Sequence, residues 1–239
     1  MKKSTLLRLA VCITAYCLLL AAYSSAQTPN LVWAKAVGGT FNDFGNSIVT
    51  DVSGNVYTTG YFAGTVDFDP SAATYTLTSV GADDIFVSKL DAAGNFVWAR
   101  AMGGGTGNDH GNSIALDPSG NIYVAGTVNN PAERIWIGKF SPSLGYINSV
   151  MPFPAFTGVG LDITMSDQGF LYAAGYDPSS GGYAFWVGKY DSDLNLLAST
   201  SLPVGVGSSG GAVTVDGSGN VYGSGRSLDG LFVAKYDSN

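Results

Sequence analysis

The amino-acid sequence predicts an all-β fold: a β-propeller of four blades, each about 50 residues long and four-stranded, forming a closed small ring or a partial propeller. Three observations support this prediction. A ten-residue motif occurs four times, its strands are apolar on both faces, and no convincing helical stretch follows residue 27. Four antiparallel strands per unit are typical of a propeller blade, whereas a β-helix repeats at shorter intervals.

The recurring motif reads DVSGNVYTTG, DPSGNIYVAG, SDQGFLYAAG and DGSGNVYGSG, at residues 51–60, 117–126, 166–175 and 216–225. Its tyrosines are separated by 66, 49 and 50 residues: Tyr57, Tyr123, Tyr172 and Tyr222. An insertion accounts for the longer first spacing. The spacing divides the chain into repeats at about 31–95, 96–145, 146–195 and 196–239.

Each copy of the motif is predicted to be a turn between two antiparallel strands. In the second copy, Asp117 suits the first position of a type I turn and Pro118 suits the second. Gly120 can take the left-handed conformation that completes a bulged hairpin. The motif recurs because every blade needs one such turn.

The strand that follows the turn is apolar on both sides. In NIYVAG, Ile122 and Val124 face one way while Tyr123 and Ala125 face the other. Such a strand must be covered on both faces, as in a blade sandwiched between its neighbours. The other three strands of each unit follow the patterns NSIALD, IWIGKF and FVWARAM.

The tryptophan-type strand bears on whether the ring closes. By analogy with related propeller repeats, NSIALD is innermost and the tryptophan strand is outermost. The chain then opens on an outermost strand, residues 31–37, and ends after a third strand, residues 231–237. We therefore expect residues 31–37 to complete the fourth blade as a clasp. The alternative, an open arc, would expose two apolar blade faces and unpaired strand edges.

The first 26 residues are predicted to be a secretory signal peptide. Lys2, Lys3 and Arg8 precede an apolar run, and small residues close the segment before Gln27. The apolar run is shorter than the roughly 20 residues of a membrane span. Both cysteines, Cys12 and Cys17, lie inside the signal, so the mature domain, 27–239, has no thiol. We expect a secreted or cell-surface protein with no membrane span in its mature chain.

The charge of the mature chain excludes one class of partner. Eight basic side chains remain against eighteen acidic ones, a net charge of −10, and Glu133 is the sole glutamate. Such a surface repels phosphate backbones, which makes nucleic acid an unfavourable partner. The aspartates suit turns, where their carboxylates accept hydrogen bonds from nearby backbone N–H groups.

A known family shares these motifs. The run W-A-K/R, G-G, D-x-G-N-S-I, D-x-S-G-N-V-Y-x-x-G and F-V-x-K-Y/L-D-x-x-G-N resembles the SBBP family, the bacterial beta-propeller repeat. Residues 31–95 match best, and residues 96–145 are close. The resemblance implies an exported, multi-bladed protein, usually without an assigned activity, and supplies no catalytic residues.

The candidate catalytic and cationic side chains have structural interpretations. His110, the single histidine, aligns with Phe44 of the first repeat, which indicates a packing position rather than a general base. Lysines recur in the third strand of every repeat: Lys89, Lys139, Lys189 and Lys235. We expect packed stems with ammonium groups that reach outward, at least two of them to a carboxylate. The alternative is a ring of lysines that binds an anion at one channel mouth.

The insertion of the first repeat contains the metal candidates. Asp67, Asp69, Asp83 and Asp84 could supply hard oxygen ligands for calcium. The alternative is a solvated extra hairpin, in which Asp69 begins the turn and Val66, Phe68, Tyr75 and Leu77 pack the hairpin down. No other cofactor is expected, and no residue is predicted to be catalytic.

Three functions fit this sequence. The first is a non-catalytic exported propeller that serves as an interaction or surface-scaffold module, with an unknown protein or glycan as partner. The second is a propeller that binds a glycan, or another ligand with the help of calcium, although Trp136 and Trp186 fall in a core-like strand. The third is a polysaccharide-degrading enzyme, which requires two facing carboxylates. Because the aspartates resemble turn residues, the first function is favoured.

Overall fold

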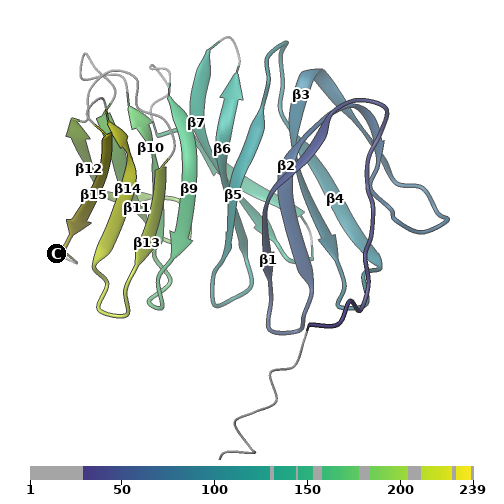
Figure 1. The fold of residues 1–239 in the computed structure, drawn as a ribbon, viewed down its shortest axis with the longest axis horizontal. Helices are drawn as coiled ribbons and strands as arrows, with labels where there is room; N and C mark the ends of the chain where they lie inside the picture. The colour runs from purple at the N-terminus through teal and green to yellow at the C-terminus, as the bar shows by residue number, and fades with distance from the viewer. Residues whose placement is uncertain are drawn as a thin grey trace, which may run out of the picture. The chain divides into compact units, whose positions relative to one another are not determined.

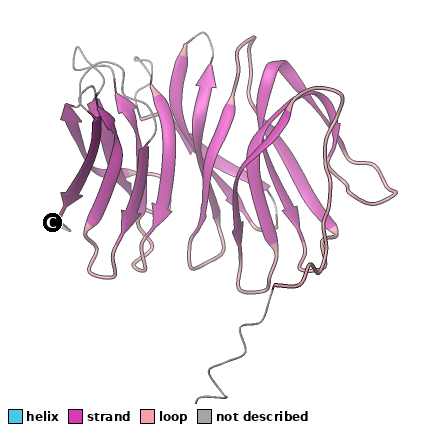
Figure 2. Cartoon of the chain, viewed as in Figure 1, coloured by secondary structure: helices cyan, strands magenta, loops and turns pink. Residues whose placement is uncertain are grey.

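The computed structural model describes residues 29–129, 132–143, 145–152, 158–177, 184–203, 211–227 and 230–237. The chain divides into two units, Met1–Ala34 and Lys35–Asn239. The predicted signal peptide lies outside the described residues. Within the described part of the second unit, all regular structure is β-strand (Figure 2).

The strands of the second unit form four antiparallel sheets, each a simple meander in chain order (Figure 1). The first sheet contains β1 (Asp43–Thr50), β2 (Val56–Asp67), β3 (Thr76–Leu90) and β4 (Phe96–Met102). The second contains β5 (His110–Leu116), β6 (Ile122–Asn129), β7 (Glu133–Ser141) and β8 (Gly145–Val150). The third contains β9 (Val159–Met165), β10 (Leu171–Asp177), β11 (Ala184–Tyr190) and β12 (Leu196–Pro203), and the last contains β13 (Gly211–Val215), β14 (Val221–Ser227) and β15 (Gly230–Tyr236).

The sheets pack face to face, as the apolar pattern of the strands predicts. On β6, Val124 lies in a buried cluster with residues of the first sheet, such as Ile85. Its neighbour Tyr123 lies in a second cluster with residues of the third sheet, such as Leu171. A third cluster joins the third and last sheets. The core is therefore divided into layers between consecutive sheets, as expected for propeller blades.

The first strands of consecutive sheets, β1, β5, β9 and β13, lie next to one another, and the tryptophan-type strand β4 forms the opposite edge of its sheet. Asparagine side chains link the neighbouring strands. Asn46 Nδ2 donates to Gly111 O at 2.9 Å, and Asn112 Nδ2 donates to Gly160 O at 2.6 Å. The first sheet thus binds the backbone of the second, and the second binds that of the third, through their first strands.

The recurring motif forms the predicted turn. Gly120 has φ of 81° and its N–H donates to Asp117 O at 2.9 Å, while Asp117 N donates to Asn121 O at 3.0 Å. The Asp117 side chain accepts four further contacts: the N–H groups of Ser119 and Asn121, the Asn121 amide, and the Tyr123 hydroxyl at 3.2 Å. The other copies contain glycine at φ of 79° (Gly54), 81° (Gly169) and 84° (Gly219).

The same turn also joins the third and fourth strands of two sheets, a use that the sequence analysis did not identify. Asp91 and Asp191 accept hydrogen bonds from the backbone and side chain of Asn95 and Asn195. In the second of these turns the left-handed position is held by Leu194, with φ of 66°. Leu194 is only 5% exposed, so burial of its side chain offsets the backbone strain.

Hydrogen bonds to the ionised carboxylates lower the pKa values of three turn aspartates, Asp91, Asp191 and Asp216. The Asn220 side chain, with backbone N–H groups and the Tyr222 hydroxyl, lowers the pKa of Asp216 to about 2. Hydrogen bonds from Asn95 and Asn195 lower the pKa values of Asp91 and Asp191. These turns therefore hold charged aspartates throughout the neutral range.

The insertion in the first repeat forms a hairpin extension. An extra hairpin was the alternative to a calcium site in the sequence-based prediction. Beyond a bulge at residues 63–65, Val66 pairs with Leu77. Val66 and Phe68 are 1% and 2% exposed and pack on Phe62 and Phe86. The extension thus gives the first sheet an additional apolar cluster.

The clasp predicted for residues 31–37 is not found. The last sheet has three strands, and the described residues 29–37 form no strand. Gly38, which follows this segment, makes an isolated antiparallel bridge with Asp67 of β2. The chain just before β1 is therefore bound to the first sheet by a backbone contact rather than to β15. Phe44 and Ile48 on the first sheet are 49% and 68% exposed, and Leu231 and Val233 on the last sheet are 80% and 71% exposed.

We predict that Asp117→Ala lowers the free energy of unfolding by about 1–3 kcal/mol, because it removes the acceptor of four polar groups in a nearly buried turn. The matched control is Asp167→Ala, an exposed aspartate in the third copy of the motif, expected to change stability by less than about 0.5 kcal/mol. Urea unfolding monitored by tryptophan fluorescence measures both. Equal effects of the two substitutions would contradict the assigned role of the turn.

Candidate binding groove

Each third-strand lysine lies over a tyrosine ring of its own sheet. The two residues are direct partners in the register, as for Lys89 with Tyr57 and Lys235 with Tyr222. The ammonium nitrogens lie 5.0, 5.8, 5.7 and 5.3 Å from the ring centroids of Tyr57, Tyr123, Tyr172 and Tyr222, in chain order. These are distances at which a cation is attracted to the face of an aromatic ring.

The lysines of the first two sheets bind the next sheet. Lys89 Nζ donates to Pro142 O at 3.1 Å, beside Trp98 Nε1, which donates to the same carbonyl at 3.1 Å. Lys139 Nζ donates to Ser192 O at 2.6 Å. Both acceptors belong to the turn between the third and fourth strands of the following sheet. The lysines therefore join consecutive sheets at their outer half.

The lysines contact fewer carboxylates than predicted. Among the described residues, Lys139 alone reaches a carboxylate, Asp193 at 3.4 Å, whose side chain is 78% exposed. At least two such pairs were expected. At Lys89, a turn carbonyl and a tyrosine ring already occupy the ammonium group, so a carboxylate partner is not needed.

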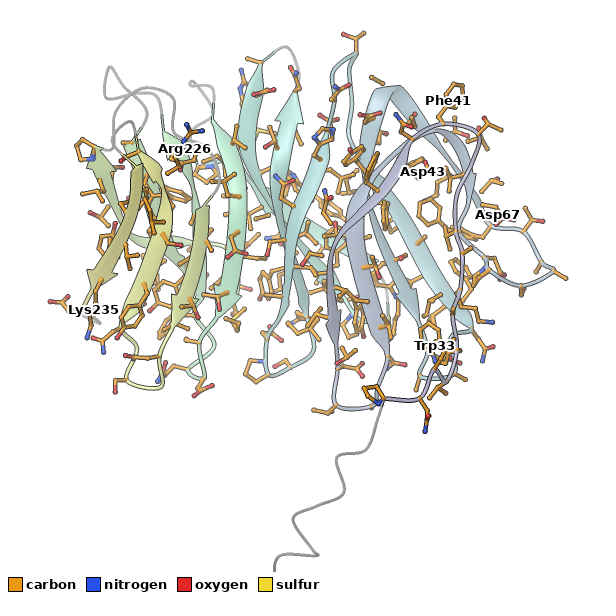
Figure 3. The ribbon with its side chains drawn as sticks, viewed as in Figure 1. Trp33, Phe41, Asp43, Asp67, Arg226 and Lys235 are labelled. Carbon is orange, nitrogen blue, oxygen red and sulfur yellow. The ribbon has the colours of Figure 1, made fainter. Side chains whose placement is uncertain are left out.

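A groove of about 470 Å³ lies between the third and last sheets and contains the other two lysines. Lys189 of β11 and Lys235 of β15 contribute charge, Tyr172 and Val187 contribute apolar surface, and Thr200 of β12 contributes a hydroxyl. Figure 3 shows Lys235 at the opposite end of the last sheet from Arg226. The volume is within the range of small-ligand sites.

The groove borders an open sheet edge. In the described part of the chain, β15 pairs with β14 only, whereas β3, β7 and β11 each pair with a fourth strand. The register β3–β4 places Lys89 opposite Trp98, so a fourth strand beside β15 would place its tryptophan-equivalent residue opposite Lys235. This edge can hydrogen-bond an added extended segment.

His110 lies in an aromatic stack rather than beside a nucleophile. Its ring is stacked on Tyr61 with centroids 4.0 Å apart, and Tyr61 is stacked on Phe44 at 5.0 Å. His110 Nε2 lies 3.3 Å from Asp83 Oδ2. The described contacts of this histidine are packing and one ion-pair contact to a carboxylate.

The four calcium candidates do not act as one group. Asp67 Oδ1 accepts the N–H groups of Asp69 and Tyr75, and Asp69 accepts the N–H of Ser71, so both shape the hairpin turn. Asp84 instead lies with Asp109 beside Gly103. Asp109 was not among the residues predicted from the sequence. The described residues contain no group of three or more His, Cys, Asp or Glu side chains placed to hold a metal ion.

A signal for Asp109 was present in the sequence. Asp109 occupies the repeat position of Asp43, in the shared Asn-Asp pair before the first strand. Asp43 Oδ2 accepts the Gly39 N–H at 2.7 Å, and Asp109 Oδ2 accepts the Gly104 N–H at 2.9 Å. The alignment of the two repeats therefore indicates a common role in holding the glycine-rich loop.

Comparison with known proteins agrees with this architecture. The SBBP family, described as a beta-propeller repeat, matches residues 32–61 and 97–131. An uncharacterized WD repeat-containing protein of Acanthamoeba polyphaga mimivirus is 24% identical over 206 residues, which cover 80% of this chain and 13% of that protein. The chain thus spans about an eighth of the length of that relative.

One similar solved structure is a protein of unknown function from Bacteroides caccae, with a TM-score of 0.42 and 10% sequence identity, covering 81% of this chain and 78% of that one. No helix long and apolar enough to cross a bilayer occurs in the described ranges. The family match and the four antiparallel sheets agree: residues 32–61 and 97–131 contain beta-propeller repeats of the SBBP type, and they lie in the first two of the four sheets or just before them.

Proposed function

We propose that this repeat scaffold is a non-catalytic, exported interaction module that binds a protein partner in extended conformation along β15. The observation that carries this proposal is the open edge of β15 beside the lysine-lined groove. Main-chain hydrogen bonds to such an edge provide affinity, and the side pockets provide specificity. Leu231 and Val233, on the same strand, add exposed apolar surface.

The side chains available for other activities support this choice. Trp98, Trp136 and Trp186 are 5%, 5% and 1% exposed, so these rings are committed to the core rather than free to stack on a sugar. Asp51, Asp117 and Asp216 of the recurring motif hold turns, which leaves them unsuited to the facing acid and base of a glycosidase. The proposal therefore includes no catalytic residue and no required cofactor.

We predict that a labelled peptide with the sequence of residues 96–102, the fourth strand of the first sheet, binds the last sheet. In the first sheet this segment pairs with β3, the strand that corresponds to β15, and the equivalent edge of β15 has no partner strand among the described residues. Fluorescence anisotropy should show saturable binding that Leu231→Asp/Val233→Asp weakens by at least about tenfold, since charge is introduced beside the docked strand. Ile48→Asp, on an exposed position of β1, is the matched control and should leave binding unchanged.

A scrambled peptide of the same composition should bind at least as weakly as the native peptide binds the double variant. Equal binding of both peptides, or equal loss in the control variant, would refute the proposed site. Circular dichroism of each variant establishes that the sheets are intact.

Export is tested separately. In a host with a general secretory pathway, the full chain should appear outside the cytoplasm with Gln27 as its first residue, as read by mass spectrometry of the intact protein. Retention of residues 1–26 on the protein in the cytoplasm would exclude the proposed location.

A further inference from the structure

The joint between the first and second sheets contains two buried carboxyl groups. Asp84 of β3 is 2% exposed, and Asp109, which immediately precedes β5, is 1% exposed. The backbone joins the sheets at this position, because Asp109 N donates to Asp83 O at 2.8 Å. Neither carboxyl belongs to the groove or to the recurring turns.

The hydrogen bonds of this pair leave one oxygen unsatisfied. Asp84 Oδ2 accepts the Val80 N–H at 3.0 Å. Asp109 Oδ1 accepts the Asn129 N–H at 2.6 Å, and Asp109 Oδ2 accepts the Gly104 N–H at 2.9 Å. Asp84 Oδ1 is fully buried and has no partner among the described residues. A buried polar atom without a partner is costly, so something must satisfy it.

The unsatisfied oxygen and the second carboxyl group both lie beside Gly103. A Cβ added at Gly103 would stand 2.5 Å from Asp84 Oδ1 and 2.6 Å from Asp109 Oδ2. Both oxygens thus lie where a side chain at residue 103 would stand, and glycine leaves that space to the two carboxyl groups. Two ionised carboxylates cannot both be buried side by side without a large penalty.

The surrounding charges do not neutralise the pair. Asp83, next to Asp84, adds negative charge that disfavours ionisation of Asp84. His110 acts on Asp109 in the opposite direction, but its Nε2 lies 3.3 Å from Asp83 Oδ2. A single hydrogen on Asp84 Oδ1 would satisfy this atom, remove one negative charge and give Asp109 a further donor.

We propose that Asp84 and Asp109 share one proton, held on Asp84 Oδ1 and donated toward Asp109, and that this proton fastens the first sheet to the second. Asp109 then remains an anion that accepts hydrogen bonds from two backbone N–H groups and from the O–H group of Asp84. The joint is a pH-sensitive contact between blades, independent of the groove at the other end of the stack.

The direction of the pH effect follows from burial. Desolvation raises the pKa values of both Asp84 and Asp109 above the ordinary 3.8. The folded protein therefore retains a proton that the unfolded chain releases above pH 3.8, so stability is highest toward acidic pH and is lost as pH rises through the raised pKa. The lowered pKa values of Asp91, Asp191 and Asp216 act in the opposite direction, because their contribution to stability is lost only as pH falls below the ordinary 3.8.

Thermal unfolding of the mature chain between pH 4.5 and 8.5 tests this proposal. The parent protein should lose at least about 2 °C in melting temperature across this range. Asp84→Asn supplies a permanent N–H donor while keeping an acceptor for Val80, so it should flatten the pH dependence and melt above the parent at pH 8.5. The parent and Asp84→Asn proteins both carry the additional substitution His110→Phe, so that the histidine does not contribute to the pH dependence. Phenylalanine occupies the equivalent position of the first repeat, Phe44, and does not titrate.

Three results would overturn the shared proton. The first is a melting temperature of the His110→Phe parent that does not fall as pH rises. The second is an Asp84→Asn protein that melts below the parent at every pH with an unchanged slope. The third concerns calcium at pH 8.5. If replacing a chelator by calcium raises the melting temperature of the parent but not of Asp84→Asn, the site binds a cation rather than a proton.

Discussion

The structure depends on one interaction, the aspartate carboxylate that closes the hairpin of the recurring motif. Asp117 holds the backbone of Asn121 and contacts the hydroxyl of Tyr123, and Asp51 and Asp216 do the same for Tyr57 and Tyr222. The fixed tyrosine provides the ring over which the third-strand lysine lies. That lysine binds a carbonyl of the next sheet, so the geometry of a local turn is transmitted to the contact between blades.

Local chemistry decided what could be predicted from the sequence. The turn was predictable because Asp117 and Gly120 have side-chain and backbone preferences of their own, and the double-sided burial of β6 was visible in four consecutive apolar residues. The partners of Lys89 and Lys139 were not predictable, because a backbone carbonyl leaves no mark in the sequence. The Asp84–Asp109 pair was missed because its members come from different repeats and meet only when two sheets pack.

The stack has unequal ends. Every inner sheet is covered on both faces, as the buried clusters on either side of β6 illustrate. The first sheet compensates for its open face with the apolar cluster of its hairpin extension, in which Phe68 is buried. In the described residues, the last sheet has three strands and exposed Leu231 and Val233. In a repeat protein whose units are stabilised mainly by their neighbours, we expect this sheet to be the least stable of the four described here.

Native-state hydrogen exchange, followed by mass spectrometry, tests most directly the claim that stability passes from sheet to sheet. Amides of β6, β7, β10 and β11, which lie between covered faces, should exchange slowest, and those of β13, β14 and β15 should exchange fastest among the strands. Protection of β14 equal to that of β6 would contradict this account, because it would mean that a sheet without a second neighbour is as stable as one enclosed on both sides.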